Sequence, residues 1–374
     1  MSTVRELHQA AMELAELATA ARITGGIAAS RDLLRQAMHQ EIQAAEIVAS
    51  NFQAEPTRSV LLRSAASLAL QCGEWREAER LISVALAASP PASVAEELRD
   101  LLEQTYFERH LSLRGIVLEP QELQLSIAGK MAGAGITLSE AFVGRVQDIQ
   151  RLVVRTVERK LGRAFREHGQ APASIVKQWQ LFLLAPRPGS FTVTLRIGRP
   201  EQPLLPGLED AFEPEIIDDL LTNFELLNSS REDELHRRIP EESYYRNFVG
   251  LAKQIAPDGQ TISFVGLTSQ QGEQERRVQI TRYQNTIRWI GETETGGGGE
   301  MVTVTGRLLF ADSTKGSEGR IDLIDATKER HKIRVPEGMM TDIVRPLYED
   351  EVTVTGVKRK GLIFLQNIER VVPA

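Results

Sequence analysis

Several residue types that specialised sites depend on are scarce in this chain. Cys72 is the single cysteine among 374 residues, which excludes an intrachain disulfide and a cysteine-ligated zinc site. This cysteine usage is typical of a reducing compartment and predicts a cytoplasmic, bacterial-type protein. Aromatic residues make up 5% of the sequence, a low share for a carbohydrate cleft or an extended base-stacking surface.

Long apolar runs and catalytic signatures are missing as well. No run approaches about 18 apolar residues, and the opening MSTVRELHQAAMELAEL lacks a basic start followed by an apolar core. We therefore expect neither a membrane span nor a signal peptide. The six histidines show no HxH, HxxH or HExxH spacing, and no GxSxG motif occurs. The sequence predicts no metal, no cofactor and no membrane partner.

The remaining composition is that of a globular protein, with 42% apolar residues, 25% charged residues and a net charge of −7. At roughly 100–200 residues per domain, the length predicts several domains. We predict a multidomain α+β protein with helical repeats over 1–108, a mixed α/β middle domain over 109–292, a glycine-rich linker over 293–300 and a small β-barrel over 301–374. The net negative charge argues against the whole molecule acting as an electrostatic nucleic-acid binder.

Alanine and leucine recur at helical spacing near the N-terminus, and one pattern occurs twice. It begins at Leu14 and returns 48 residues later at Leu62. The second copy, VLLRSAASLALQCGEWREAERLISVALAASP, resembles a tetratricopeptide repeat through Ala66, Gly73, Ala78, Ile82, Ala85 and Pro90. The spacing is longer than the roughly 34 residues typical of that family. The resemblance implies helical hairpins whose shared surface binds another protein or a peptide segment.

The middle part alternates between strand and helix patterns. Apolar residues at every second position predict strands near Leu111–Leu113 and Leu123–Ile127, and a hairpin that turns at Pro188-Gly189. Between them we predict a long helix over 139–168. Further helices over 213–256 and two strands after Pro257 complete a two-layer α/β domain.

The helix predicted over 139–168 has arginines opposite its apolar stripe, at Arg151, Arg155, Arg159, Arg163 and Arg166. The pattern favours a solvated face interleaved with acidic residues; the alternative is a docking site for an acidic partner or RNA. Arg163 and His168 also form an R-x4-H spacing that occurs in HEPN ribonucleases. The polar residue usual after that arginine is replaced by Ala164, and we favour a chance match.

The segment VTVTG occurs at both 302–306 and 352–356, and the surrounding pattern is strand-strand-strand-helix-strand-strand. This order resembles the OB-fold, a five-stranded barrel. Because the flanking sequences do not repeat, we predict one barrel with the two segments as its first and fourth strands. Val302, Val304, Val352 and Val354 are expected to point inward, and the glycines at 306 and 356 are expected where the strands bend.

The OB-fold resemblance implies a binding surface on the second and third strands and the loops beside them. The cations predicted there are Lys332, Arg334, Lys358, Arg359 and Lys360. We expect a non-enzymatic adaptor that uses the helical repeats. The alternative is a nucleic-acid-associated regulator that uses the barrel and the arginine helix, and a weaker one is a HEPN-like ribonuclease. The glycines of the linker predict that the barrel separates cleanly from the rest.

Overall fold

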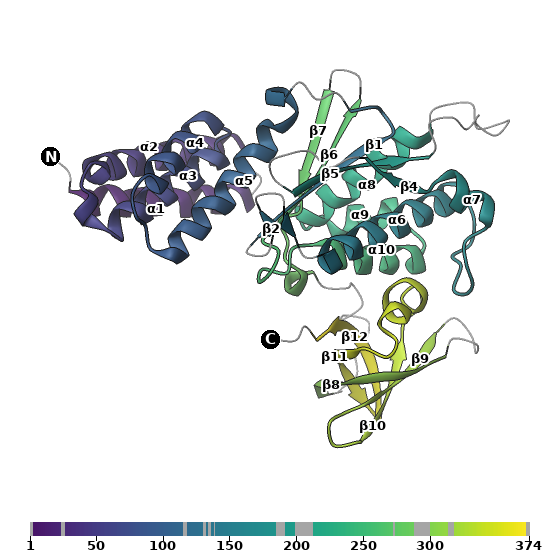
Figure 1. Ribbon diagram of the computed structural model, residues 1–374. Helices are drawn as coiled ribbons and strands as arrows, with labels where there is room; N and C mark the ends of the chain where they lie inside the picture. Colours follow the sequence, from purple (N-terminus) through teal and green to yellow (C-terminus); the bar gives the residue numbers. More distant parts are fainter. Residues whose placement is uncertain are drawn as a thin grey trace. The chain divides into compact units, whose positions relative to one another are not determined.

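The computed structural model describes residues 3–23, 27–114, 118–129, 132–133, 136–137, 139–184, 191–198, 212–271, 274–287, 300–312 and 318–371 (Figure 1). The chain forms two compact units. The first consists mainly of Met1–Val117, and the second contains most of the chain from Leu118 to Ala374. No helix within the described ranges is long and apolar enough to cross a membrane.

The first unit is a helical array. Its elements are α1 (Val4–Ile23), α2 (Ile27–Ala49), the 3-10 turn η1 (Phe52–Ala54), α3 (Thr57–Gln71), α4 (Trp75–Leu86) and α5 (Ala92–Arg114). Its core contains many alanines, including Ala66, Ala78 and Ala85, each fully buried. Such small side chains let helix backbones approach closely. Gly73 has a φ of +78° between α3 and α4, a left-handed conformation that glycine adopts at low cost.

The ends of two helices, α5 and the helix predicted over 139–168, differ from the prediction. The strand predicted near Leu111–Leu113 is wrong, because α5 continues as helix to Arg114. Its glutamate, leucine and arginine residues are good helix formers, and they outweigh a short period-two pattern. The helix predicted over 139–168 ends at Lys160, because Gly162 has a φ of +65° and stops the helical path.

The second unit contains a five-stranded sheet in the order β4-β5-β1-β6-β7. The strands are β1 (Glu122–Ala128), β4 (Leu181–Leu183), β5 (Phe191–Ile197), β6 (Phe264–Gln271) and β7 (Gln274–Gln279); β2 (Ala132–Gly133) and β3 (Ile136–Thr137) are two further short strands. Leu125 of β1 and Leu195 of β5 are fully buried, and all seven residues of β1 are buried, so burial along this strand does not alternate.

Helices gather on one side of this sheet (Figure 1). They are α6 (Ser139–Lys160), α7 (Ala173–Gln178), α8 (Phe212–Asn228), α9 (Glu232–Arg238) and α10 (Glu242–Ile255), and the 3-10 turn η2 (Gln284–Thr286) follows β7. Ile149, Val153 and Val157 in the apolar stripe of α6 are buried. Burial of this stripe against neighbouring elements leaves the arginine side of α6 to contact other parts of the unit.

The C-terminal part of the second unit is a closed barrel, which confirms the prediction of a small five-stranded barrel. Its elements are β8 (Glu300–Asp312), β9 (Gly319–Ile324), β10 (Arg330–Val335), the short helical turns η3 (Met340–Val344) and η4 (Arg345–Leu347), β11 (Glu351–Arg359) and β12 (Leu362–Arg370). The closed order is β10-β12-β11-β8-β9, in which β10 and β12 are parallel. Closure leaves no free strand edge within the barrel.

The two VTVTG segments are antiparallel partners in β8 and β11, where Val304 lies opposite Val354. Val352 and Val354 are fully buried, whereas Val302 and Val304 are only partly buried, so the inward orientation predicted for the first segment is incomplete. The strand register shifts between Thr355 and Gly356. A Cβ on Gly356 would lie 2.2 Å from the carbonyl oxygen of Phe364, so this close approach requires glycine.

The predicted clean separation of the barrel does not match its contacts. Barrel and middle part belong to the same compact unit, and the chain between β10 and β11 contacts α6 and α10. Asp342 of η3, for example, accepts a hydrogen bond from Arg155 of α6 at 2.7 Å. The predicted linker itself lies outside the described residues, apart from its last residue at 300. Its composition carries no information about complementary side chains farther along the chain.

Candidate nucleic-acid interface on the barrel

Two phenylalanines on the outside of the barrel each have two arginines beside them. The guanidinium carbons of Arg320 and Arg330 lie 5.8 and 6.0 Å from the ring centre of Phe310. Those of Arg334 and Arg359 lie 5.9 and 5.8 Å from the ring centre of Phe364. At these distances a guanidinium is attracted to the negative face of an aromatic ring.

Strand register explains why these side chains share one surface. On β10, Ile333 and Val335 point into the barrel and are fully buried, so Arg330, Lys332 and Arg334 point outward. Arg334 lies opposite Arg320 on one neighbouring strand and opposite Phe364 on the other. Phe310 and Lys332 both lie opposite Asp322. We call this surface the barrel face; its members are Phe310, Arg320, Asp322, Arg330, Lys332, Arg334, Arg359 and Phe364.

Asp322 holds two of the arginines in place. Its side chain is on the outer side of β9 yet only 2% exposed, because Arg320 and Arg330 cover it. Arg330 donates from Nε to Oδ2 at 2.8 Å, and Arg320 donates from Nη2 to Oδ1 at 3.2 Å. One carboxylate thus orients two guanidinium groups beside Phe310 and leaves a net positive charge there.

The turn between β11 and β12 extends the positive charge of the barrel face. Lys358 and Lys360 are exposed on either side of Arg359, and Lys360 and Gly361 both have positive φ angles in this tight turn. Arg334 also forms an ion pair with Glu318. The cations of the face and the turn still outnumber Glu318 and Asp322, so the region remains positive although the whole chain is acidic.

The sequence had indicated part of this surface. Lys332, Arg334, Lys358, Arg359 and Lys360 are the cations expected from the OB-fold resemblance; Lys332 and Arg334 lie on β10, the other three lie at the turn between β11 and β12, and Arg334 and Arg359 both flank Phe364. Arg320 and Arg330 were not predicted to belong to this surface, and Phe310 and Phe364 stand out in the sequence only as two of the three aromatic residues of the barrel. The alternation R-x-K-x-R at 330–334 contained the signal for Arg330, whereas the place of Arg320 depends on strand pairing.

The arginine row of α6 has a different environment from the solvated face that we expected. Arg155 is only 4% exposed and pairs with Asp342 and Glu158. The other ion pairs of this row are Arg151 with Asp148, Arg159 with Asp219, and Arg166 with Glu158. These contacts within the chain account for the row, and binding of an outside partner by Arg151, Arg155 or Arg159 stays a prediction.

Burial also changes the chemistry of Asp148 on α6. Desolvation raises the pKa of its carboxyl to about 6, although the ion pair with Arg151 acts in the opposite direction. Asp148 is buried beside Arg151, and the structure places it on the helix that carries Arg155. A raised pKa in this setting reflects the cost of a buried charge within the fold.

Arg163 and His168 lie beyond the end of α6, in a segment without helical structure, and both are exposed. The carbonyl of Arg163 accepts a hydrogen bond from the Tyr244 hydroxyl at 3.1 Å. Because the segment is not helical, the R-x4-H spacing does not put the two side chains one turn apart on a helix. The geometry that would favour a ribonuclease pair is therefore missing from this described segment.

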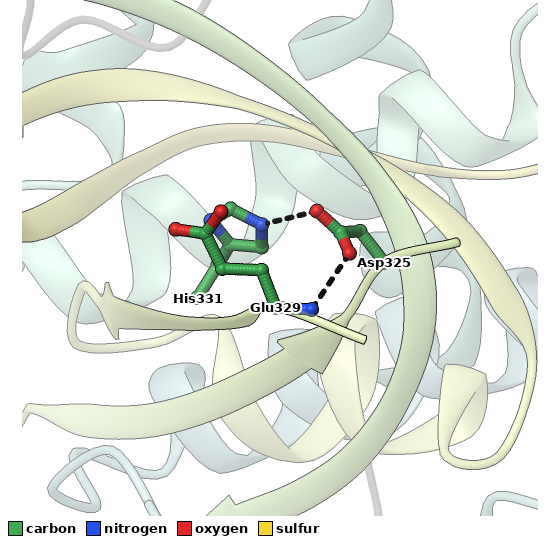
Figure 2. Close-up of side chains that lie close together, drawn as sticks. All are labelled: Asp325, Glu329 and His331. Carbon is green, nitrogen blue, oxygen red and sulfur yellow. Dashed lines mark hydrogen bonds and ion pairs between the residues drawn. The ribbon is translucent and has the colours of Figure 1, made fainter. Parts of the chain in front are cut away.

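Asp325, Glu329 and His331 lie close together at the turn between β9 and β10, with one ligand atom from each within 4.8 Å of the others. Figure 2 shows that Asp325 is the centre of this group. Its Oδ1 accepts from the backbone N–H of Thr327 and of Glu329, both at 2.9 Å, and its Oδ2 lies 2.9 Å from His331 Nε2. The hydrogen bond with His331 depresses the pKa of Asp325. Both carboxylate oxygens of Asp325 therefore take part in hydrogen bonds within the turn, and these bonds stabilise the turn.

Two hollows lie on other surfaces. In the helical unit, a groove of about 320 Å³ is lined from α3 by Arg63, Ser64 and Ser67, and from α5 by Glu97, Asp100, Leu101 and Gln104. In the second unit, a cleft of about 520 Å³ is lined by Pro120, Lys160, Pro214, Glu215, Asp218, Asp219 and Arg238. The cations of that cleft pair with its carboxylates, as Arg238 does with Asp219 at 2.9 Å.

The tetratricopeptide-like positions Ala66, Ala78, Ile82 and Ala85 are fully buried in the helical core, and Pro90 lies between α4 and α5. These residues therefore pack the array and do not line the groove.

Comparison of the chain with models of protein families, with curated proteins and with solved structures gives no match.

Proposed function

We propose that this protein binds single-stranded nucleic acid through the barrel face and acts without catalysis. The observation that carries the proposal is the arrangement of Arg320, Arg330, Arg334 and Arg359 around two phenylalanine rings on the outside of the barrel. The OB-fold resemblance supports it, because β9 and β10 take the place of the second and third strands, where proteins of that fold bind oligonucleotides.

The chemistry of the barrel face suits an unpaired strand. A base stacks on an aromatic ring only when the ring face and the base face are both accessible, and such stacking contributes about 1–3 kcal/mol per base. Arginine stays charged at every physiological pH and its planar fork matches a phosphate group. Phe310 is 38% exposed and Phe364 is partly buried.

The test is a titration of the full chain with short fluorescent single-stranded RNA and DNA at low and at physiological salt. We expect binding that weakens at least about tenfold on combined Phe310→Ala and Phe364→Ala substitution, because two stacking contacts are lost. Arg307→Ala is the matched control, since Arg307 is an exposed arginine of β8 that contacts the Glu349 carbonyl. No binding to either strand at low salt would remove the proposal.

A second function rests on the groove between α3 and α5, where Asp100 and Glu97, which pairs with Arg63, supply carboxylates. In this adaptor role the helical unit binds a basic peptide segment of another protein. Combined Glu97→Lys and Asp100→Lys substitution should abolish capture of that partner, while Glu16→Lys on the exposed side of α1 should not. Equal capture by the wild type, the Glu97→Lys/Asp100→Lys variant and the Glu16→Lys variant would show that the groove is not the binding surface.

A further inference from the structure

A short stretch of the barrel contacts the helices of the same unit. We call residues 336–344, between β10 and the end of η3, the docking segment. Its Met339 and Ile343 are fully buried and lie beside Gly250 of α10. A Cβ on Gly250 would lie 2.1 Å from Ile343 Cδ1, and one on Gly338 would lie 2.2 Å from the Ser243 carbonyl oxygen. The two surfaces thus meet through a glycine on each side.

The polar centre of this contact is a buried ionic group. Asp342 Oδ2 accepts from Arg155 Nε at 2.7 Å and from Asn247 Nδ2 at 3.0 Å. Arg155 also donates from Nη1 to Glu158 at 3.1 Å. The barrel supplies only Asp342 to this group, whereas α6 and α10 supply its partners. Removing the Asp342 carboxylate would leave Arg155 paired with Glu158 alone and would take away the hydrogen bonds that Arg155 and Asn247 donate to the barrel.

Backbone contacts add specificity around the ionic group. Glu167 accepts from the Gly338 N–H at 3.1 Å, and Asn247 donates to the Gly338 carbonyl at 2.8 Å. Gly338 has a φ of +85°, so its conformation favours glycine. Outside the docking segment, Lys253 of α10 donates to Asn367 of β12 at 2.6 Å.

The docking segment also contacts the barrel itself, through a different residue. Met340 lies against Gly319 at the start of β9, where a Cβ would come within 2.2 Å of Met340 Cε. Met340 therefore holds the segment to the barrel, while Met339, Asp342 and Ile343 face the helices. Loss of the helix contacts need not disturb the barrel core, which is closed by its own strands.

We propose that the docking segment is a releasable latch. With Asp342 between Arg155 and Asn247 the barrel is fixed on α6 and α10, and without that carboxylate the barrel detaches and stays folded. Three features support a latch over a permanent core contact. The docking segment covers only residues 336–344, and its central contact is the ion pair of Asp342 with Arg155. Four consecutive glycines also occur in the sequence between Ile287 and β8. This inference does not depend on what the barrel face binds.

Hydrogen exchange on the full-length chain tests the latch with Asp342→Asn. We expect exchange in 336–344 and in α10 to rise at least about tenfold, because loss of one partner from a buried pair shifts the docking equilibrium by more than that. Strands β8 and β11 should keep their protection. Small-angle scattering should show a larger radius of gyration. Asp350→Asn is the matched control, since Asp350 pairs with Arg370 within the barrel.

Gly250→Leu provides a second variant that leaves the barrel sequence intact. Its side chain would clash with Ile343, so it should release the barrel in the same way. Wild-type protection of 336–344 in both variants would overturn the latch. Loss of protection in β8 and β11 together with 336–344 in Gly250→Leu would overturn it too, because the segment would then be part of the barrel fold.

Discussion

At the scale of single residues, buried charges in the second unit depend on partners supplied by other elements. Asp322 orients two arginines of the barrel face, and Asp342 joins the barrel to α6. A carboxylate in such a position costs desolvation energy that its ion pairs offset. At Asp148 the ion pair with Arg151 does not fully offset this cost, because burial still raises the pKa of the carboxyl.

This balance predicts how stability depends on pH. The pKa of Asp148 rises from 3.8 in the unfolded chain to about 6 in the fold. Below 3.8 both states hold the proton; between the two values only the folded state holds it; above about 6 the folded state carries a buried charge. The free energy of unfolding of the wild type therefore falls by up to about 3 kcal/mol as the pH rises from 3.8 to about 6.

Asp148→Asn removes this titration and keeps an acceptor for Arg151. We expect its free energy of unfolding, from urea denaturation, to gain on the wild type by about 1–3 kcal/mol between pH 4 and pH 7. Asp350→Asn, at an exposed pair, should not show this gain. If the free energies of unfolding of Asp148→Asn and wild type change with pH in parallel, the buried charge of Asp148 is not the cause of the pH dependence.

A second prediction at the residue scale concerns Arg163 and His168. Their segment is not helical, and both side chains are exposed. Combined substitution to alanine should leave folding unchanged and remove no RNA cleavage, because we expect none. Incubation of labelled RNA with wild type and double variant in EDTA checks this; cleavage by the wild type that the variant lacks would restore the ribonuclease alternative.

At the scale of elements, sequence patterns predicted what lies within one element and missed what depends on pairing between elements. The period-two pattern of VTVTG and its two copies were sufficient to predict strands of one barrel. The spacing of the arginines on α6 correctly predicted that they share one side of the helix. It did not predict which carboxylates they contact. The partner of Arg155 lies 187 residues away, at Asp342, and no local pattern points to it.

Packing within elements gives two stability predictions. Ala78 is fully buried in the helical array, so Ala78→Leu should overpack the contact and lower the free energy of unfolding by about 1–3 kcal/mol. An unchanged melting temperature would argue against close helix contact at Ala78.

Gly356→Ala should lower barrel stability by at least about 1–3 kcal/mol, because its Cβ would meet backbone and not a movable side chain. Gly361→Ala is not a neutral control, since Gly361 has a φ of +78°, so Val357→Ala at a partly exposed site serves better. Equal loss in both variants would show that the close approach at Phe364 is not the cause.

At the scale of the whole molecule, the chain is acidic, whereas the barrel face and the turn between β11 and β12 carry more cations than carboxylates. Phosphate contacts release counterions, so log affinity for a single strand should fall against log salt with a slope of roughly −0.7 per contact. Arg334→Ala should make this slope shallower by about one contact, whereas the Phe364→Ala slope should match the wild type. A salt-independent affinity would mean that phosphates are not bound by these arginines.

The central claim is that bases stack on the barrel face, and photo-crosslinking tests it most directly. A short single strand carrying 5-bromouracil or 4-thiouracil would be irradiated with the full chain, and the crosslinked peptides identified by mass spectrometry. If bases stack on these rings, crosslinks are expected at Phe310 and at Phe364. Replacing one ring by leucine should remove the crosslink at that ring. Crosslinks confined to α6 or to the helical unit, or none at saturating strand concentration, would contradict it.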